Sequence, residues 1–290
     1  MRKRRMALGI GLFLLVCGYL RFVLFPLAKP DMETQTLAGQ EAEQLMEGRR
    51  ETEEELLSGL VFAGSELPCD KASGTFYLPL DMDAAAWESG VFTAAEDGVK
   101  VYLLENPLED DKQEAVRSGK SYGLLAVKGD VYRKYAVVFT GLPILTLDTD
   151  SGDEIRYEEI YGTMRFYEAD SKTDWVTESV MSGHIRGGSS RLNPKKSYKI
   201  TLYKRNQTGM GGLRENHKSF LGMREDDEWL LYAMYSEDTK VRDKLSLDVW
   251  NESGALEIDS EGFYGYHMEY IEVFQNGEYY GIYGLMGPVG

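Results

Sequence analysis

The sequence predicts an α+β protein made of an N-terminal membrane helix, a small antiparallel β domain, and a second domain that mixes strands with a helix. Three observations support this class. The chain opens with MRKRR and the apolar run MALGIGLFLLVCGYLRFVLFPLA. Short apolar runs separated by turn-forming residues follow, as in antiparallel sheets. Beyond residue 150, strand patterns surround a helical pattern at 236–254.

The composition suits two folded domains with an acidic surface. The chain has 290 residues, of which 43% are hydrophobic and 12% aromatic, so it can build two cores. Its net charge of −16 argues against general nucleic-acid binding, which needs a basic face. Cys17 and Cys69 do not predict a disulfide framework, and the scattered histidines do not predict a metal site.

Residues 1–28 predict a signal-anchor. The apolar run 6–28 matches the roughly 20 residues that cross a bilayer, and the basic residues before it favour a cytoplasmic N-terminus. Pro26 stands where a cleavage site needs a small residue, so an uncleaved anchor is favoured over a cleaved signal peptide. We therefore expect a single-pass protein of the cell membrane whose C-terminal region is extracytoplasmic.

Residues 29–60 predict an acidic stalk. The segment has few aromatic residues and many acidic ones. Its sparse apolar residues recur at steps of three and four, as on a helix: Leu37, Ala38, Ala42, Leu45 and Met46. A solvated helix and a flexible spacer both fit this pattern.

Residues 61–150 predict a β-rich accessory domain. Gly129-Asp130 separates two apolar runs and predicts a two-residue hairpin turn. Nothing in this region predicts a catalytic role. The predicted strands lie at 75–80, 98–105, 121–129, 131–141 and 143–149.

Residues 151–290 predict a second domain. Strand patterns occur at 164–169 and 197–203, and an apolar run at 228–235 precedes the predicted helix, which Ser236 or Asp238 can cap. The segment 270–285 predicts a hairpin, because Asn276-Gly277 is a strong two-residue turn signal between aromatic and β-branched residues.

The stretch HIRGGSSRLNPKKSYKITLY, residues 184–203, gathers lysines and arginines in an acidic chain and holds no Asp or Glu. Its glycines let backbone N–H groups converge on an anion, and its arginines offer guanidinium groups suited to phosphate oxygens. The candidate residues for binding an anionic cofactor are Arg186, Gly187, Ser189, Ser190, Arg191 and Lys196.

Strand alternation places Lys196 on the face shared by Tyr198, Ile200 and Leu202. A lysine at the end of an apolar face needs an anionic partner or water. A nucleotide phosphate and a carboxylate from the helix at 237–252 are both possible partners. A surface turn with solvated lysines is the alternative, because the stretch lacks the Walker and GxGxxG phosphate-loop patterns.

Three segments in order carry a family resemblance: IRGGSSRLNPKKSYKITL, FLGMREDDEWLLYAMYSEDTKVRDKLSLDVW and YIEVFQNGEYYGIYGLM. Together they resemble the bacterial CotH family of spore-coat-type atypical protein kinases. The resemblance implies a kinase-like α+β fold that uses ATP with Mg or Mn to phosphorylate protein Ser or Thr. It implies that Lys196 holds ATP phosphates, and that Asp238 and Arg242 match the family's Asp and Arg at the helix start. A helix cap and a structural ion pair are the alternative roles for these two residues.

The chain departs from the family pattern near its end. The family's metal-binding and catalytic acids follow the hairpin, and Gly287 stands where a Glu is usual. We therefore expect 151–290 to be the N-terminal part of a kinase-like module, active only with a C-terminal lobe. The alternative is a non-catalytic scaffold of the envelope or spore coat. The expected partners are a protein substrate or envelope and coat proteins, and the membrane through residues 6–28, without nucleic acid.

Overall fold

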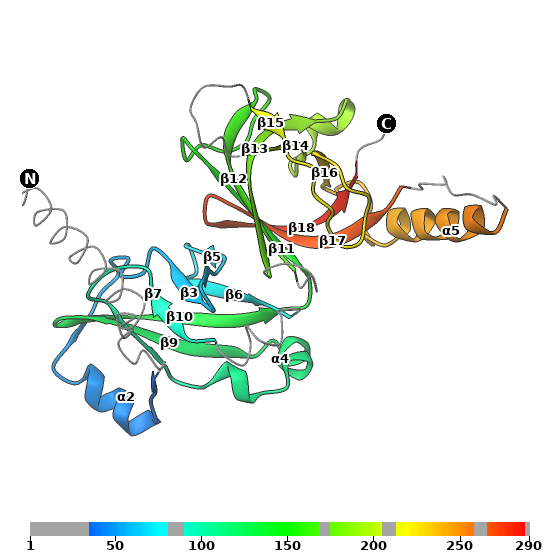
Figure 1. Ribbon diagram of the computed structural model, residues 1–290. Helices are drawn as coiled ribbons and strands as arrows, with labels where there is room; N and C mark the ends of the chain where they lie inside the picture. The colour runs from blue at the N-terminus through cyan, green and yellow to red at the C-terminus, as the bar shows by residue number, and fades with distance from the viewer. Residues whose placement is uncertain (1–34, 81–89, 169–174, 205–212, 258–265, 288–290) are drawn as a thin grey trace, which may run out of the picture. The chain divides into compact units, whose positions relative to one another are not determined.

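The computed structural model describes residues 35–80, 90–168, 175–204, 213–257 and 266–287. These residues belong to one compact unit, Gln35–Gly290. Two large sheets dominate it (Figure 1).

The first sheet has seven strands in the order β1-β8-β9-β10-β6-β5, with β2 paired to β10. Lys128 and Val131 pair across Gly129-Asp130, which confirms the predicted hairpin turn. Tyr122, Leu124 and Ala126 are fully buried along β9 and form part of the core of this sheet. The strands are β1 Gln35–Thr36, β2 Arg50–Glu51, β5 Cys69–Asp70, β6 Thr75–Pro79, β8 Lys100–Leu103, β9 Ser121–Lys128 and β10 Val131–Thr140.

Smaller elements surround the first sheet. Leu37 and Ala42, from the segment predicted as a stalk, are buried, and Gln35 pairs with Tyr102 of β8. The predicted domain boundaries remain predictions. The elements are α2 Gly39–Met46, η1 Pro107–Glu109, α4 Lys112–Ser118 and the three-stranded sheet of β3 Leu60–Phe62, β4 Ser65–Glu66 and β7 Phe92–Ala94.

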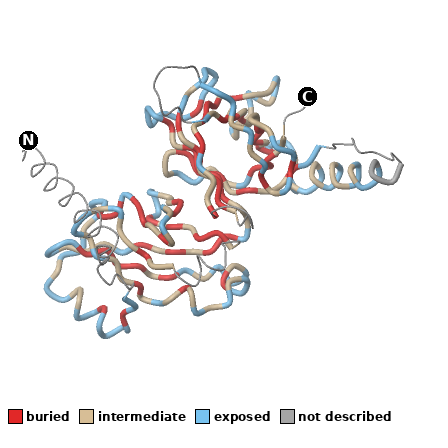
Figure 2. The backbone as a smooth tube through the Cα atoms, viewed as in Figure 1, coloured by how far each residue is buried: buried red, intermediate tan, exposed pale blue. Residues whose placement is uncertain are grey.

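The second sheet runs β13-β12-β11-β17-β18-β16-β14-β15, and β13 also pairs with β14, so seven of its strands close on themselves. Buried residues lie along the strands of this sheet (Figure 2). Its core includes Tyr198, Ile200 and Leu202 of β14, as the alternation predicted. The strands are β11 Ile144–Thr149, β12 Ile160–Tyr167, β13 Val176–Arg186, β14 Ser197–Lys204, β15 Arg214–Glu215, β16 Glu228–Tyr232, β17 Met268–Gln275 and β18 Glu278–Met286.

The hairpin of β17 and β18 confirms the turn predicted at Asn276-Gly277. Both residues have positive φ, 53° and 78°, as a tight hairpin turn requires. The amide of Asn276 reaches β11, where its oxygen accepts a hydrogen bond from the backbone N–H of Thr149 at 2.9 Å. This hydrogen bond holds the turn against the end of β11.

The predicted α+β class is wrong. In the described residues, eighteen labelled strands stand against three α-helices, so the protein is mostly β-sheet. Beyond residue 150 the one described α-helix is α5, Arg242–Glu257. The sequence VTESVMSGHIR forms the long strand β13, although its polar and small residues give little alternation. Its pairing with both β12 and β14 makes it part of the closed second sheet.

The predicted N-terminal membrane helix is also corrected. Residues 6–28, on which it was based, lie outside the described residues. Within the described part of the chain, no helix is both long and apolar enough to cross a bilayer. The described helices have 8, 7 and 16 residues and carry charged side chains, whereas a span needs about 20 apolar residues. The single-pass membrane localisation with an extracytoplasmic C-terminal region therefore has no support.

Candidate functional site

The basic stretch forms the connection between β13 and β14, whose ends pair at Arg186 and Ser197. Gly187 has a φ of 110°, and a Cβ atom there would lie 2.1 Å from Oγ of Ser190. This position therefore requires glycine. Residues Ser189–Leu192 form a short 3-10 turn, in which Arg191 donates its backbone N–H to the carbonyl oxygen of Gly188 at 3.3 Å.

Lys196 folds back onto this turn. Its Nζ donates to the carbonyl oxygens of Arg191 at 2.8 Å and Asn193 at 2.6 Å. The side chain therefore does not continue the apolar face of β14. These carbonyl groups supply the acceptors that its ammonium needs.

Lys195, which the sequence argument passed over, is the lysine whose ammonium enters the site. It is half-buried, its Nζ donates to the carbonyl oxygen of Ile282, and Nζ lies 4.1 Å above the centre of the Tyr283 ring. Burial, with a smaller effect from the nearby charge of Lys240, lowers the pKa of Lys195 to about 8. Among the described residues, no carboxylate pairs with this ammonium.

A second lysine borders the site from the segment after β16. Lys240 has a φ of 60°, and its Nζ donates to the carbonyl oxygen of Met234 at 2.6 Å. Asn193 of the turn reaches the same segment, where its Nδ2 donates to Oγ of Ser236 at 3.5 Å. The turn, the segment 234–240 and strand β18 thus meet around Lys195.

Tyrosines line the same end of the closed sheet. Burial raises the pKa of Tyr198, Tyr280 and Tyr283. The rings of Tyr198 and Tyr283 lie 6.1 Å apart, and their side chains hydrogen-bond. Because these hydroxyls stay neutral at physiological pH, they do not neutralise Lys195.

The structure places Asp238 and Arg242 on the surface at the start of α5. Asp238 is exposed, and Arg242 lies with its Nε 3.7 Å from Oε1 of Glu237. Glu237 accepts hydrogen bonds from the backbone N–H groups of Thr239 at 2.9 Å and Arg242 at 3.3 Å. These bonds, with the Thr239 hydroxyl first, lower the pKa of Glu237. Glu237, which the sequence did not single out, therefore takes the capping role that was predicted for Ser236 or Asp238.

A different group in the described residues has the composition of a metal site. Ligand atoms of Glu215, His217 and Asp227 lie within 4.8 Å of one another. Nε2 of His217 faces Glu215 at 3.6 Å, and Nδ1 faces Asp227 at 3.7 Å. The ring thus lies between the carboxylates, as in an ion pair. Because Glu215 pairs with Tyr203, this group lies at the far end of β14 from the basic turn.

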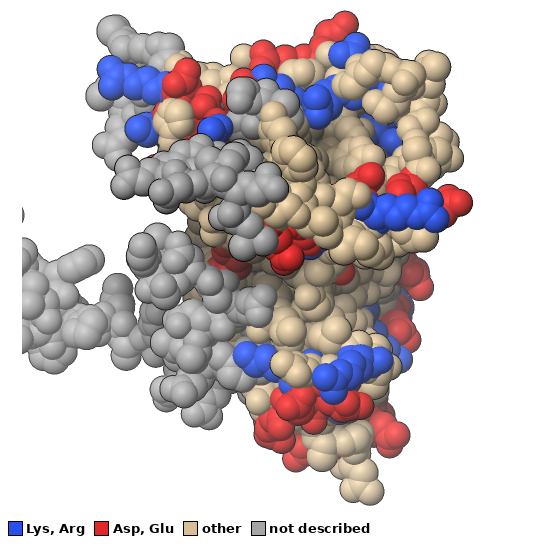
Figure 3. All heavy atoms as spheres, turned by 90° about the vertical axis from the view of Figure 1, so that its right-hand side faces the viewer, with Lys and Arg blue, Asp and Glu red and all other residues tan. Residues whose placement is uncertain are grey.

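Charged side chains are dispersed on the face that Figure 3 shows. Basic and acidic groups stand among uncharged ones on this face. The basic residues of the turn are therefore a local feature of an acidic protein.

Comparison with family models matches residues 184–289 to CotH, described as CotH kinase protein. This confirms the resemblance predicted from the three segments. The matched residues begin at the end of β13 and continue through the turn, β14, β16, α5 and the β17–β18 hairpin. Comparison with the curated proteins gives no match.

Proposed function

We propose, from the match of residues 184–289 to the CotH kinase family, that this CotH-like protein binds ATP beside Lys195 and serves phosphoryl transfer to Ser or Thr of a protein. The observation that carries the proposal is the half-buried ammonium of Lys195, which has no carboxylate partner in the described residues. A buried cation is costly without an anion, and a phosphate offsets that cost.

The surroundings of Lys195 suit a polyphosphate. Lys240 adds a second positive charge, and its effect on Lys195 shows that the two ammonium groups interact. Attraction to an anion is stronger here than at the surface, because partial burial lowers the effective dielectric constant. Two neighbouring cations without a neutralising acid match the charge of a triphosphate better than that of a single carboxylate.

The other residues of the basic stretch take supporting roles in this proposal. Lys196 holds the turn through its two carbonyl contacts and acts as a positioning residue. Gly187, Ser189 and Ser190 supply the bend, and Arg186 and Arg191 border it. Asp238 and Arg242 lie at the start of α5, where they would face the protein substrate rather than the phosphates.

Mg²⁺ or Mn²⁺ would accompany the nucleotide and neutralise phosphate charge. The residues described here do not fit a dedicated metal site beside Lys195, because the one group of three His and acidic ligands found among them is at the far end of β14. We therefore derive no metal-dependent step from these residues.

A non-catalytic scaffold for envelope or coat proteins is the second candidate. The observation that favours it is the environment of Lys196. Its ammonium donates hydrogen bonds to carbonyl oxygens of its own turn and does not project into a pocket. In that case the kinase-like sheet would serve as a binding surface, and Lys195 would be a structural cation packed on Tyr283.

Calorimetric titration with ATP separates the two functions. We expect saturable binding of ATP with Mg²⁺ or Mn²⁺, and transfer of labelled γ-phosphate to a protein acceptor once a C-terminal lobe is present. The absence of saturable heat from a folded sample would refute nucleotide binding and leave the scaffold. Binding without transfer by a protein that carries this lobe would refute the kinase activity alone.

A further inference from the structure

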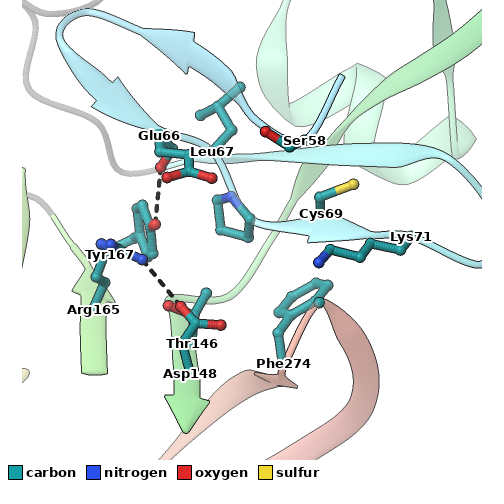
Figure 4. A pocket seen from close by; sticks show the side chains of 12 residues that line it. Ser58, Glu66, Leu67, Cys69, Lys71, Thr146, Asp148, Arg165, Tyr167 and Phe274 are labelled. Atoms are coloured by element: carbon teal, nitrogen blue, oxygen red, sulfur yellow. Dashed lines mark hydrogen bonds and ion pairs between the residues drawn. The ribbon is translucent and has the colours of Figure 1, made fainter. Parts of the chain in front are cut away.

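A cavity of about 270 Å³ lies where the first sheet meets the closed sheet, away from the basic turn (Figure 4). Both walls belong to the same compact unit. Its volume is below the roughly 300–1,000 Å³ typical of drug-sized ligands, so an occupant would be small. The lining includes Glu66, Lys71, Thr146, Asp148, Arg165 and Phe274.

The charges on the walls are not all neutralised by the protein. Arg165 is satisfied, because its Nη1 lies 3.0 Å from Asp148 and its Nε lies 3.1 Å from Glu178. Glu66 and Lys71 form no direct ion pair among the described residues, although Lys71 interacts at longer range with Asp148 and Glu66 with Arg165. The cavity therefore carries one anion and one cation that are free of direct ion pairs, on separate parts of its wall.

Both charged side chains lie beside a glycine, whose missing Cβ leaves room for them. The side chain of Lys71 crosses Gly277, where a Cβ atom would lie 2.6 Å from its Cε, and its backbone N–H donates to the carbonyl oxygen of Gly277 at 2.9 Å. The carboxylate of Glu66 lies over Gly59, where a Cβ atom would lie 2.7 Å from Oε1.

The remaining lining offers recognition without reactivity. Burial raises the pKa of Cys69 to about 12, so its thiol stays protonated and is a poor nucleophile. Thr146 is buried, and its hydroxyl interacts with that of Tyr167. Phe274 and Leu67 supply apolar surface. These groups suit binding of a small molecule rather than covalent chemistry.

We propose that this cavity binds a small zwitterion of the amino-acid class, whose ammonium group is bound by Glu66 and whose carboxylate is bound by Lys71. Such a ligand satisfies both free charges at once, which neither a simple anion nor a simple amine can do. The assignment does not depend on nucleotide binding, because none of these residues belongs to the segment 184–203.

Calorimetric titration of the whole chain tests the proposal with glycine, β-alanine, 4-aminobutyrate, 6-aminohexanoate and glycylglycine, a series that varies the distance between the two charges. We expect saturable binding of at least one member. Acetate and methylamine, which carry one charge each, should bind at least about tenfold more weakly. No saturable binding across the series, or equal binding of a single-charge analogue, would overturn the assignment.

Variants test the two charges separately. Lys71→Met and Glu66→Gln should each weaken binding of the best zwitterion by about tenfold or more. Both side chains are exposed, so we expect both variants to fold, as a far-UV circular dichroism spectrum would check. Lys100→Met, an exposed lysine of β8, is the matched control and should bind as the wild type does. Unchanged affinity in both cavity variants would refute the site.

Discussion

The ammonium nitrogen of Lys195 lies 4.1 Å from the centre of the Tyr283 ring, while the ammonium of Lys196 donates to the carbonyl oxygens of Arg191 and Asn193. Two consecutive lysines thus differ in environment. The first is half-buried without a carboxylate in the described residues, and the second is satisfied by its own turn. In the proposed function Lys195 binds the nucleotide and Lys196 holds the turn, and this difference leads to the first prediction.

Replacing the two lysines by methionine should change two different properties, ATP affinity and stability. Lys195→Met removes the free cation, so ATP affinity should fall by about tenfold or more. Lys196→Met removes two hydrogen bonds from a charged donor, so the free energy of unfolding should fall by about 1–3 kcal/mol. Titration calorimetry measures the first effect, and urea unfolding measures the second.

The control for this pair is Lys128→Met, an exposed lysine on β9, which should alter neither property. If Lys196→Met loses ATP binding at wild-type stability while Lys195→Met keeps it, the roles assigned to the two lysines are reversed.

The pH dependence of ATP binding should report the ionisation of Lys195. Burial lowers its pKa from the ordinary value of 10.5 to about 8, so the side chain is charged at pH 7 and mostly neutral at pH 9. We expect affinity to fall by about tenfold between these values, because the neutral amine no longer attracts phosphate. Lys195→Arg, whose guanidinium does not deprotonate in this range, should bind with little change. A flat wild-type profile would contradict the prediction.

The stability of the basic turn should depend more on Gly187 than on Gly188. Gly187→Ala places a methyl group 2.1 Å from Oγ of Ser190 at a φ of 110°, so the free energy of unfolding should fall by about 1–3 kcal/mol. Gly188→Ala is the comparison and should cost less: its Cβ has open space, although its backbone at φ −94° and ψ −103° lies outside the helical and extended regions. Urea unfolding of both variants checks this. Equal stability of the two proteins would show that the turn relaxes without cost.

Local signals in the sequence predicted the parts of the fold that depend on neighbouring residues. The Asn276-Gly277 hairpin and the inward face at Tyr198, Ile200 and Leu202 were predicted because turn chemistry and alternation are short-range properties. The closure of the second sheet was not predicted, because it depends on the pairing of β11 with β17, two strands that lie far apart in the sequence.

The side chain of Lys196 leaves the apolar face of β14 for a related reason. Alternation from Tyr198 extends to Lys196 only if the strand does, and β14 begins at Ser197. The two preceding residues follow the turn instead, and this conformation directs Lys195 to Tyr283. Likewise α5 starts at Arg242 and not at 236, because Lys240 adopts a positive φ, which a helix does not allow.

A buried carboxyl on β17 should make stability depend on pH. Burial raises the pKa of Glu272 to about 7 from an ordinary 4.5, and its charge contributes to the raised pKa values of Tyr77 and Tyr279. The folded state therefore binds a proton between pH 4.5 and 7 that the unfolded state has released, so this group lowers stability as the pH rises through that range.

Glu272→Gln should remove this dependence. We expect the variant to have a free energy of unfolding higher than that of the wild type by about 1–3 kcal/mol at pH 8, with the difference vanishing near pH 4. Urea unfolding at pH 4, 6 and 8 measures it, and Glu278→Gln, an exposed position on β18, is the control. A difference that stays constant with pH would show that the effect comes from packing against the neighbouring tyrosines and not from the ionisation of this carboxyl.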